Sequence, residues 1–207
     1  MNPALMDIER IVKRGLRSLR NCLWDDPECY WPQEGEQNGL PERNLSIHVG
    51  HRFLADGWIV FAEPSFPGRT DRRIDFMALK RGVLVTAECK QLDMSDRSAQ
   101  FAHDIRGLKS FRLTKAWNNK EYQAPKVTRR IGVLLANTWS FEVQHWWKGS
   151  NHVLLPDGRS GPGWKALRTE LRKFDEPGCS VFGVEWLNRP SETDEPDFWA
   201  LYAMFEL

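Results

Sequence analysis

The stretch Ile74–Gln91, IDFMALKRGVLVTAECKQ, decides the fold because it contains two strand-forming runs with a short break between them. Both runs are rich in apolar residues, and Lys80-Arg81-Gly82 separates them. A break of this length predicts a β-hairpin with strands at 74–79 and 83–90. Nearly all side chains on both faces of this hairpin are apolar, which is typical of central strands covered on both sides.

The turn determines which residues of the hairpin face each other. If Arg81-Gly82 is a two-residue loop, Lys80 pairs with Val83, and counting back along both strands places Asp75 opposite Glu88. A three-residue turn would slip this register by one and separate the two carboxylates.

Asp75 and Glu88, opposed on two central strands, need a positive charge that compensates their two negative charges. Directly opposed side chains have their Cβ atoms about 4.5–5.5 Å apart, and like charges at that separation destabilise a sheet. Lys90 emerges on the same face as Glu88, because side chains alternate along a strand. Two interpretations follow: a divalent cation bound by Asp75 and Glu88, or two solvated strand ends with Lys90 as an ordinary salt-bridge partner.

The segments around the hairpin predict an α/β or α+β fold, with a mixed central sheet flanked by helices. The helical spacing of apolar residues predicts helices at 3–21, 41–56, 98–113 and 163–174. Short apolar runs predict further strands at 58–62, 131–136, 181–186 and 198–205. Segments that contain Pro and Gly predict loops at 24–40 and 63–72.

The size and composition fit one globular domain, with 207 residues, a net charge of +1 and 41% hydrophobic residues. No apolar run is long enough to cross a membrane, and the N-terminus does not resemble a signal peptide. We therefore expect a cytoplasmic protein with a single domain at 1–207. Within it we expect a core at 41–136, an N-terminal helix at 3–21 and a C-terminal elaboration at 137–207.

The motif formed by Asp75, twelve further residues and Glu88-Cys89-Lys90 resembles that of the PD-(D/E)xK nuclease superfamily, which has the restriction-endonuclease-like fold. The resemblance extends over residues 41–136. It matches the order of elements: a helix with an inward Glu42, a strand, the Asp strand, the ExK strand, a helix and a further strand. Ile74 stands where the name of the superfamily has Pro.

The resemblance implies metal-dependent hydrolysis of phosphodiester bonds, usually in DNA. Asp75 and Glu88 would hold Mg²⁺, or Mn²⁺ as a substitute, with help from the backbone carbonyl of Cys89, because hard oxygen ligands suit these ions. Lys90 would orient the attacking water or help to deprotonate it, and would stabilise negative charge on the phosphate. The expected catalytic residues are therefore Asp75, Glu88, Lys90 and Glu42.

Glu42 has two interpretations. It matches an acidic residue that many members of the superfamily carry on the first helix, where it binds the metal directly or through water. The favourable interaction of a negative charge with the helix dipole explains a glutamate in a first turn equally well. His103 and Asp104, on the helix after the motif, are candidates to face the substrate, although polar residues on a helix surface need no such role.

The segment 109–130 has seven basic residues against one acid, Glu121. A solvated basic loop explains such a run, and so does contact with the phosphates of nucleic acid. The candidate contacts to nucleic acid are Lys109, Arg112, Lys115, Arg129 and Arg130. We expect DNA as the partner and no membrane; a homodimer is compatible with the short chain, but no residue pattern assigns its surface.

A second function remains open on the sequence alone. The chain could be a non-catalytic nucleic-acid-binding or protein-interaction module that has the same fold and retains the residues of the site. Other classes of enzyme find no support, because the sequence has no Gly-rich phosphate loop, no GxSxG and no HExxH motif.

Overall fold

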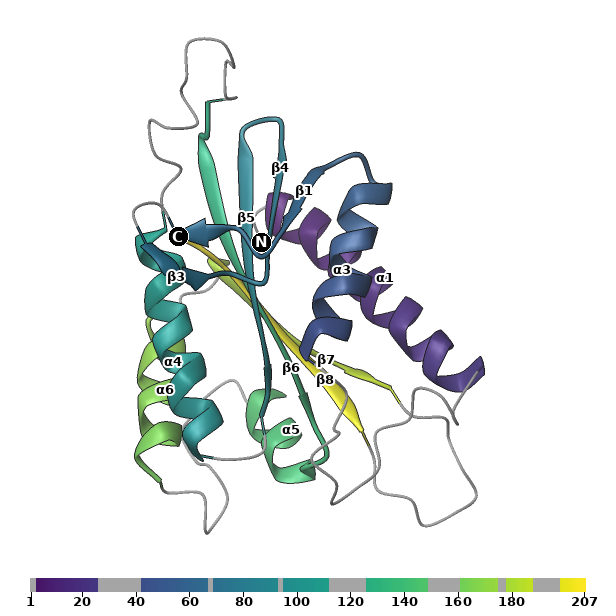
Figure 1. Cartoon of the computed structure of the whole chain (residues 1–207). Helices are drawn as coiled ribbons and strands as arrows, with labels where there is room; N and C mark the ends of the chain where they lie inside the picture. The colour runs from purple at the N-terminus through teal and green to yellow at the C-terminus, as the bar shows by residue number, and fades with distance from the viewer. Residues whose placement is uncertain are drawn as a thin grey trace.

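The computed structural model describes residues 3–25, 42–66, 69–92, 95–111, 126–148, 161–174, 178–187 and 198–207. Its centre is a six-stranded sheet with the strand order β1-β4-β5-β6-β8-β7. Helices lie on both sides of this sheet, so the protein has the mixed α/β fold that the sequence predicts (Figure 1). Within the described residues, no helix is long and apolar enough to span a membrane.

The sheet is mixed because one pair of neighbouring strands is parallel. Its strands are β1 (Ile59–Ala62), β4 (Phe76–Lys80), β5 (Val83–Gln91), β6 (Arg129–Thr138), β7 (Ser180–Trp186) and β8 (Trp199–Glu206). β5 and β6 are parallel, and the other neighbouring pairs are antiparallel. A parallel pair needs a crossover connection, and α4 (Ser95–Ser110) lies in the chain between these two strands.

The helices form a layer on each face of the sheet. α1 (Pro3–Asp25) and α3 (Glu42–Ala55) cover one face, and α4, α5 (Phe141–Lys148) and α6 (Pro162–Arg172) cover the other (Figure 1). Each layer encloses its own hydrophobic core. The side chains of β5 alternate between the two, since Val85 and Ala87 belong to the core under α1 and α3, whereas Leu84 belongs to the core under α4.

The β4–β5 hairpin has the register that the sequence predicts. Phe76 pairs with Ala87, as expected for a two-residue loop at Arg81-Gly82. Asp75 is the residue before β4, outside the paired strand, and its backbone N–H donates to the Ala87 oxygen at 3.1 Å, which places it next to Glu88. Both residues of the loop have positive φ angles, +48° and +79°, which are typical of the type I′ turns that suit the twist of a hairpin.

Two parts of the chain differ from the sequence prediction. The predicted loop at 63–72 contains β2 (Ser65–Phe66) and most of β3 (Arg69–Arg73), which pair as a separate two-stranded sheet. β3 reads RTDRR, so it has no alternation of apolar and polar residues that would indicate a strand. α5 was not predicted at all, although Trp146 and Trp147 bury it against the sheet.

The other predicted elements are present, with their ends shifted by three residues or fewer, except that α1 continues to Asp25 instead of ending at residue 21. Its apolar residues keep helical spacing as far as Leu23, which is fully buried. The remainder of the predicted loop at 24–40 lies outside the described residues.

We expect Gly82→Ala to destabilise the protein more than Gly178→Ala. Both glycines have positive φ, +79° and +85°, so the strained backbone costs about 1–2 kcal/mol in either variant. At Gly82 a Cβ atom would also lie 2.9 Å from the backbone oxygen of Lys126, whereas at Gly178 it would meet no described atom within 4 Å. Urea unfolding measures the difference, and equal losses of stability would contradict a close contact at the turn.

Candidate active site

The candidate site is centred on Asp75 and Glu88, at the end of the hairpin opposite its turn. The backbone N–H of Cys89 donates a hydrogen bond of 2.6 Å to Asp75 Oδ2. The side chains of Asp75 and Glu88 are hydrogen-bonded to each other. Only 5% of Glu88 is exposed. The Asp75 and Glu88 side chains therefore lie close enough to interact with each other.

In the absence of a bound cation, the Glu88 carboxyl is protonated at neutral pH. Burial, followed by the negative charges of Asp104 and Asp75, raises the pKa of Glu88 from 4.5 to about 9. Burial also raises the pKa of Asp75, although the Cys89 N–H and the positive charge of Lys90 oppose this effect. The Glu88 carboxyl therefore keeps its proton at neutral pH and can donate it in the hydrogen bond to Asp75.

Lys90 lies between carboxylates that come from two helices. Its Nζ atom is 3.4 Å from Asp104 Oδ2 on α4 and 3.6 Å from Glu42 Oε2 on α3. Burial alone would lower the pKa of Lys90, but the negative charges around it, with Asp104 and Glu42 first, outweigh burial and raise the pKa. Lys90 is thus a fixed cation at neutral pH, suited to orienting groups and stabilising negative charge, and not to removing a proton.

Glu42 reaches the site from the opposite helical layer. β4 begins only at Phe76, so within the described part of the chain no strand pairs with the last residues of β5 on that edge. Glu42 Oε1 accepts hydrogen bonds from the backbone N–H of Gln91 at 3.0 Å and from the Arg97 guanidinium at 2.9 Å. These two hydrogen bonds hold Glu42 at the end of β5, where its other carboxylate oxygen forms the ion pair with Lys90.

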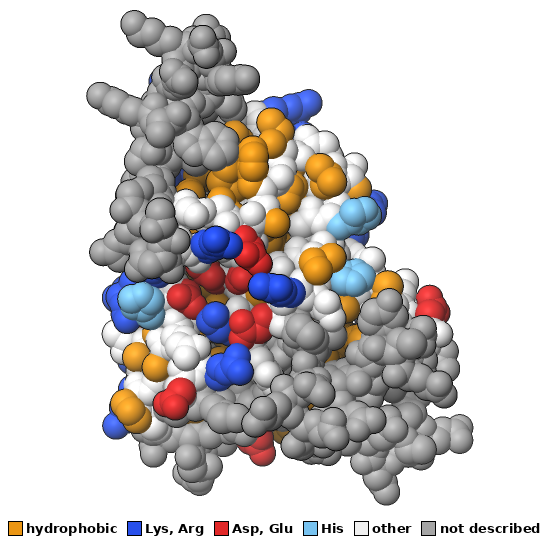
Figure 2. Space-filling view, in the orientation of Figure 1, with side chains coloured by type: hydrophobic (Ala, Val, Ile, Leu, Met, Phe, Trp, Pro, Cys, Tyr) orange, Lys and Arg blue, Asp and Glu red, His pale blue; other side chains and the backbone are white. Residues whose placement is uncertain are grey.

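The structure adds two residues that the sequence prediction missed, Arg72 and Arg97. Arg72 NH2 lies 3.9 Å from Asp104 Oδ1 and donates a hydrogen bond of 3.3 Å to the backbone oxygen of His103. No sequence signal indicated Arg72, because only the β2–β3 hairpin brings it to α4. Asp104 itself, a candidate with two interpretations, lies inside the site. Figure 2 shows acidic side chains gathered between α4 and α3, with basic side chains around them.

The residues at the centre fit a hard divalent cation. The buried Glu88 carboxyl and the half-buried Asp75 carboxyl share one proton here, and a divalent cation can take the place of that proton. In a strand the N–H and C=O of one residue point to the same side, so the Cys89 carbonyl points past the end of β4, as its N–H does. Ile74 would pair with Cys89 if β4 were longer, but it donates its N–H to the Pro64 oxygen instead. Within the described ranges, no three His, Cys, Asp or Glu side chains converge as metal ligands, so water or substrate oxygens would complete the set.

Three of the predicted contacts to nucleic acid have partners within the protein. The Lys109 ammonium lies 4.2 Å from the ring centre of Phe174, and Arg129 pairs with Glu206 at 3.2 Å. The Arg130 guanidinium donates to backbone carbonyls at the end of α4, those of Leu108, Lys109 and Phe111. Arg112 and Lys115 lie outside the described residues. A role of these five residues in binding nucleic acid remains a prediction.

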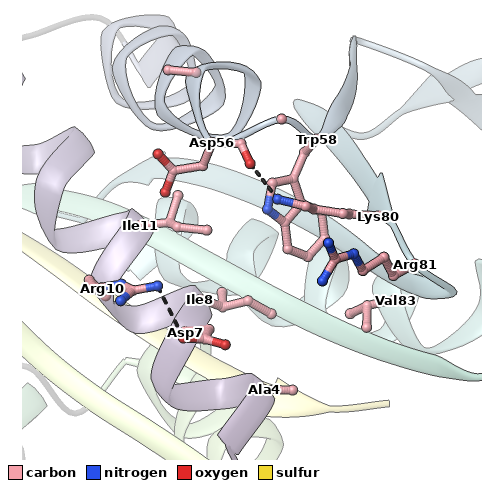
Figure 3. Close-up of a pocket in the computed structure, with 12 residues that line it drawn as sticks. Ala4, Asp7, Ile8, Arg10, Ile11, Asp56, Trp58, Lys80, Arg81 and Val83 are labelled. Atoms are coloured by element: carbon pink, nitrogen blue, oxygen red, sulfur yellow. Dashed lines mark hydrogen bonds and ion pairs between the residues drawn. The ribbon is translucent and has the colours of Figure 1, made fainter.

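A pocket of about 660 Å³ lies at the turn end of the hairpin and not at the carboxylates (Figure 3). The start of α1, the chain after α3 and the hairpin turn line it, with Ile8, Trp58 and Arg81 among the lining residues. The Lys80 ammonium at its edge donates to the backbone oxygen of Asp56. The length of β5 separates this pocket from the candidate site.

The fold and the site together define a mixed α/β protein in which a half-buried aspartate just before β4 lies next to a buried glutamate on β5, with an ion-paired lysine beside them. Comparison with models of known protein families gave no match. Neither the curated proteins nor the solved structures gave a significant match. The features of this protein that indicate a function are therefore the geometry of its candidate site and its sequence motif.

We expect the free energy of unfolding to fall as the pH rises from about 4.5 to about 9, in the absence of metal. The pKa of Glu88 is higher in the folded state than its ordinary value of 4.5, so across this range the folded protein binds more protons than the unfolded chain. The contribution of Glu88 is complete below its unfolded pKa, and its loss has a slope of at most about 1.4 kcal/mol per pH unit.

Urea unfolding at several pH values in EDTA measures this slope. Glu88→Gln should remove most of it, whereas Glu142→Gln, a change at an exposed glutamate of α5, should leave it intact. If the wild type and Glu88→Gln show parallel pH dependence, Glu88 does not carry a raised pKa.

Proposed function

We propose that the protein is a metal-dependent nuclease of the PD-(D/E)xK kind, which hydrolyses phosphodiester bonds, with DNA as the first substrate to test. The observation that carries the proposal is the contact between the Asp75 and Glu88 carboxyl groups, with Lys90 on the same face of β5. A carboxylate pair can hold a divalent cation, and a fixed positive charge beside it can stabilise the negative charge that develops on a phosphate during metal-dependent hydrolysis.

The arrangement of elements supports this proposal. The superfamily motif needs its aspartate and its ExK triplet on neighbouring strands, and β4 and β5 are neighbours with the required register. The ExK strand is followed by α4 and by the parallel strand β6, in the order that the resemblance implies. A restriction-endonuclease-like fold is therefore the finer description that we propose for this sheet.

Asp75, Glu88 and the Cys89 carbonyl would hold Mg²⁺ or Mn²⁺. When bound, such an ion lowers the pKa of a coordinated water and neutralises charge on the phosphate. The protein holds these groups in place before an ion binds. The Cys89 N–H donates a hydrogen bond of 2.6 Å to one oxygen of Asp75, and burial keeps bulk water away from Glu88. Release of the proton that Glu88 holds frees both carboxylates to act as ligands.

Lys90 would stabilise the negative charge that develops on the phosphate during attack by water. Its ammonium is already held between Glu42 and Asp104, so it needs no large rearrangement when the substrate binds. A charged group that is fixed before the reaction stabilises a transition state more effectively than one that must reorganise. Its raised pKa keeps it positively charged, which favours this role over that of a general base.

One observation favours a second function, a non-catalytic nucleic-acid-binding or protein-interaction module. The Lys90 ammonium is neutralised by two carboxylates, and among the described residues no set of three metal-binding side chains forms. A site whose charges already satisfy one another could persist as a structural feature after loss of activity. Metal binding and cleavage separate the two functions.

Cleavage of DNA in the presence of Mg²⁺ or Mn²⁺ tests the proposal directly. We expect activity in the wild type and a loss of about 100-fold or more in Asp75→Asn and Lys90→Met, since each removes a charge that acts on the transition state. Asp7→Asn and Lys165→Met are matched controls at exposed positions away from the site. Cleavage that survives both site substitutions would contradict the assignment, and panels of single-stranded, double-stranded and RNA substrates define the specificity.

Calorimetry with Mn²⁺ provides a second test that does not depend on finding the substrate. We expect the wild type to bind the ion more tightly as the pH rises from 6 to 8, because the proton on Glu88 must leave before both carboxylates coordinate. Glu88→Gln should lose binding, and Glu142→Gln should keep it. A wild type that binds no Mn²⁺ would favour the non-catalytic module.

A further inference from the structure

The candidate site contains an acidic residue that is not part of the motif, Asp104 on α4. We infer that Asp104 is a positioning residue, which holds the Lys90 ammonium in place beside the Asp75–Glu88 pair. The importance of Asp104 for catalysis rests on the proposed nuclease function. Its second effect, which is to keep the Lys90 ammonium in one position, does not depend on that function.

The geometry around Lys90 supports this role. Asp104 Oδ2 lies 3.4 Å from Lys90 Nζ, and each of the two side chains is only 18% exposed. On its other side the same ammonium lies 3.6 Å from Glu42 Oε2. The ammonium is thus held between carboxylates from two helical layers, and removal of either would let it turn toward the other.

A second set of contacts holds Asp104 itself in place. The Arg72 guanidinium lies against α4, 3.9 Å from Asp104 Oδ1, and donates to the backbone oxygen of His103. Gly107 is one turn further along α4, and a Cβ atom there would overlap the Arg72 guanidinium. This position therefore accepts Arg72 only because it has no side chain, and Arg72 in turn neutralises the second oxygen of Asp104.

Stability alone does not explain Asp104 well. Glu42 already provides Lys90 with a partner, and a further acid adds negative charge next to the buried Glu88, whose pKa it helps to raise. Partly buried ion pairs contribute little net stability, because desolvation offsets most of their attraction. A fixed direction for the Lys90 ammonium is the property that a second carboxylate supplies.

Steady-state cleavage of DNA with Mg²⁺ tests the positioning role. We expect Asp104→Asn, which keeps the shape but removes the charge, to lower kcat by roughly 10- to 100-fold with KM little changed, as misplacement of a reacting group does. Asp104→Glu should recover part of the loss, and Asp7→Asn should have no effect. An Asp104→Asn variant that folds and has the kcat of the wild type would overturn the inference.

The hold on Lys90 is measured separately, without metal or DNA, by the rate at which an N-hydroxysuccinimide ester acetylates Lys90 relative to Lys165. We expect Lys90 to react several-fold faster in Asp104→Asn than in the wild type, and Asp104→Glu to remain slow. Unchanged acetylation would overturn the inference whatever the activity. Faster acetylation in a protein that cleaves no substrate would support the hold on Lys90 and count against the nuclease function alone.

A further variant keeps the test decisive if Asp104→Asn does not fold. Gly107→Ala leaves every charge in the site but displaces Arg72 from α4, so it should raise the acetylation of Lys90 and lower kcat by a smaller factor. Gly50→Ala is the matched control, because a Cβ atom at this other helical glycine would meet side-chain atoms of Val60 and Phe76 at ordinary contact distances of 3.8 and 3.9 Å. Identical behaviour of the two alanine variants would overturn the inference.

Discussion

The two-residue turn at Arg81-Gly82 is the constraint on which the candidate site depends. A slip of one residue would turn Glu88 toward the other core and bring Cys89 to the place of a carboxylate. Burial cannot prevent this slip, because both faces of the hairpin are apolar and the two registers would bury similar side chains. The loop, with its positive φ angles, selects the register, and the carboxylate pair follows from that choice.

The site lies where the two helical layers meet at the edge of β5. β4 begins at Phe76, so α3 from one face and α4 from the other both reach Lys90 past the end of that strand. The charges collected there are Glu42, Asp75, Glu88 and Asp104 against Lys90, Arg72 and Arg97. Burial, together with the negative charges of Asp104 and Asp75, keeps a proton on Glu88. A pair of carboxyl groups that holds a proton in this way is the physical reason to expect a bound cation.

The pattern of apolar and polar residues along the chain predicted most of the helices and strands. The spacing of apolar residues predicted α1, α3, α4 and α6 and the strands of the large sheet, because each of these elements buries one or both of its faces. The β2–β3 hairpin was missed because β3 reads RTDRR, in which no alternation of apolar and polar residues indicates a strand. Arg130 shows a second limit: in the sequence it belongs to a basic run, but its guanidinium holds the last carbonyls of α4.

From the sequence alone, a two-residue loop and the alternation of side chains predict that Asp75, Glu88 and Lys90 lie together, since both act within one hairpin. The tertiary structure adds that Glu42 pairs with Lys90 and that Arg72 and Asp104 complete the cluster. Those contacts depend on where α3, α4 and the β2–β3 hairpin pack against the sheet. Burial of the two hydrophobic cores determines how these elements pack. The spacing of residues along the chain does not predict this packing.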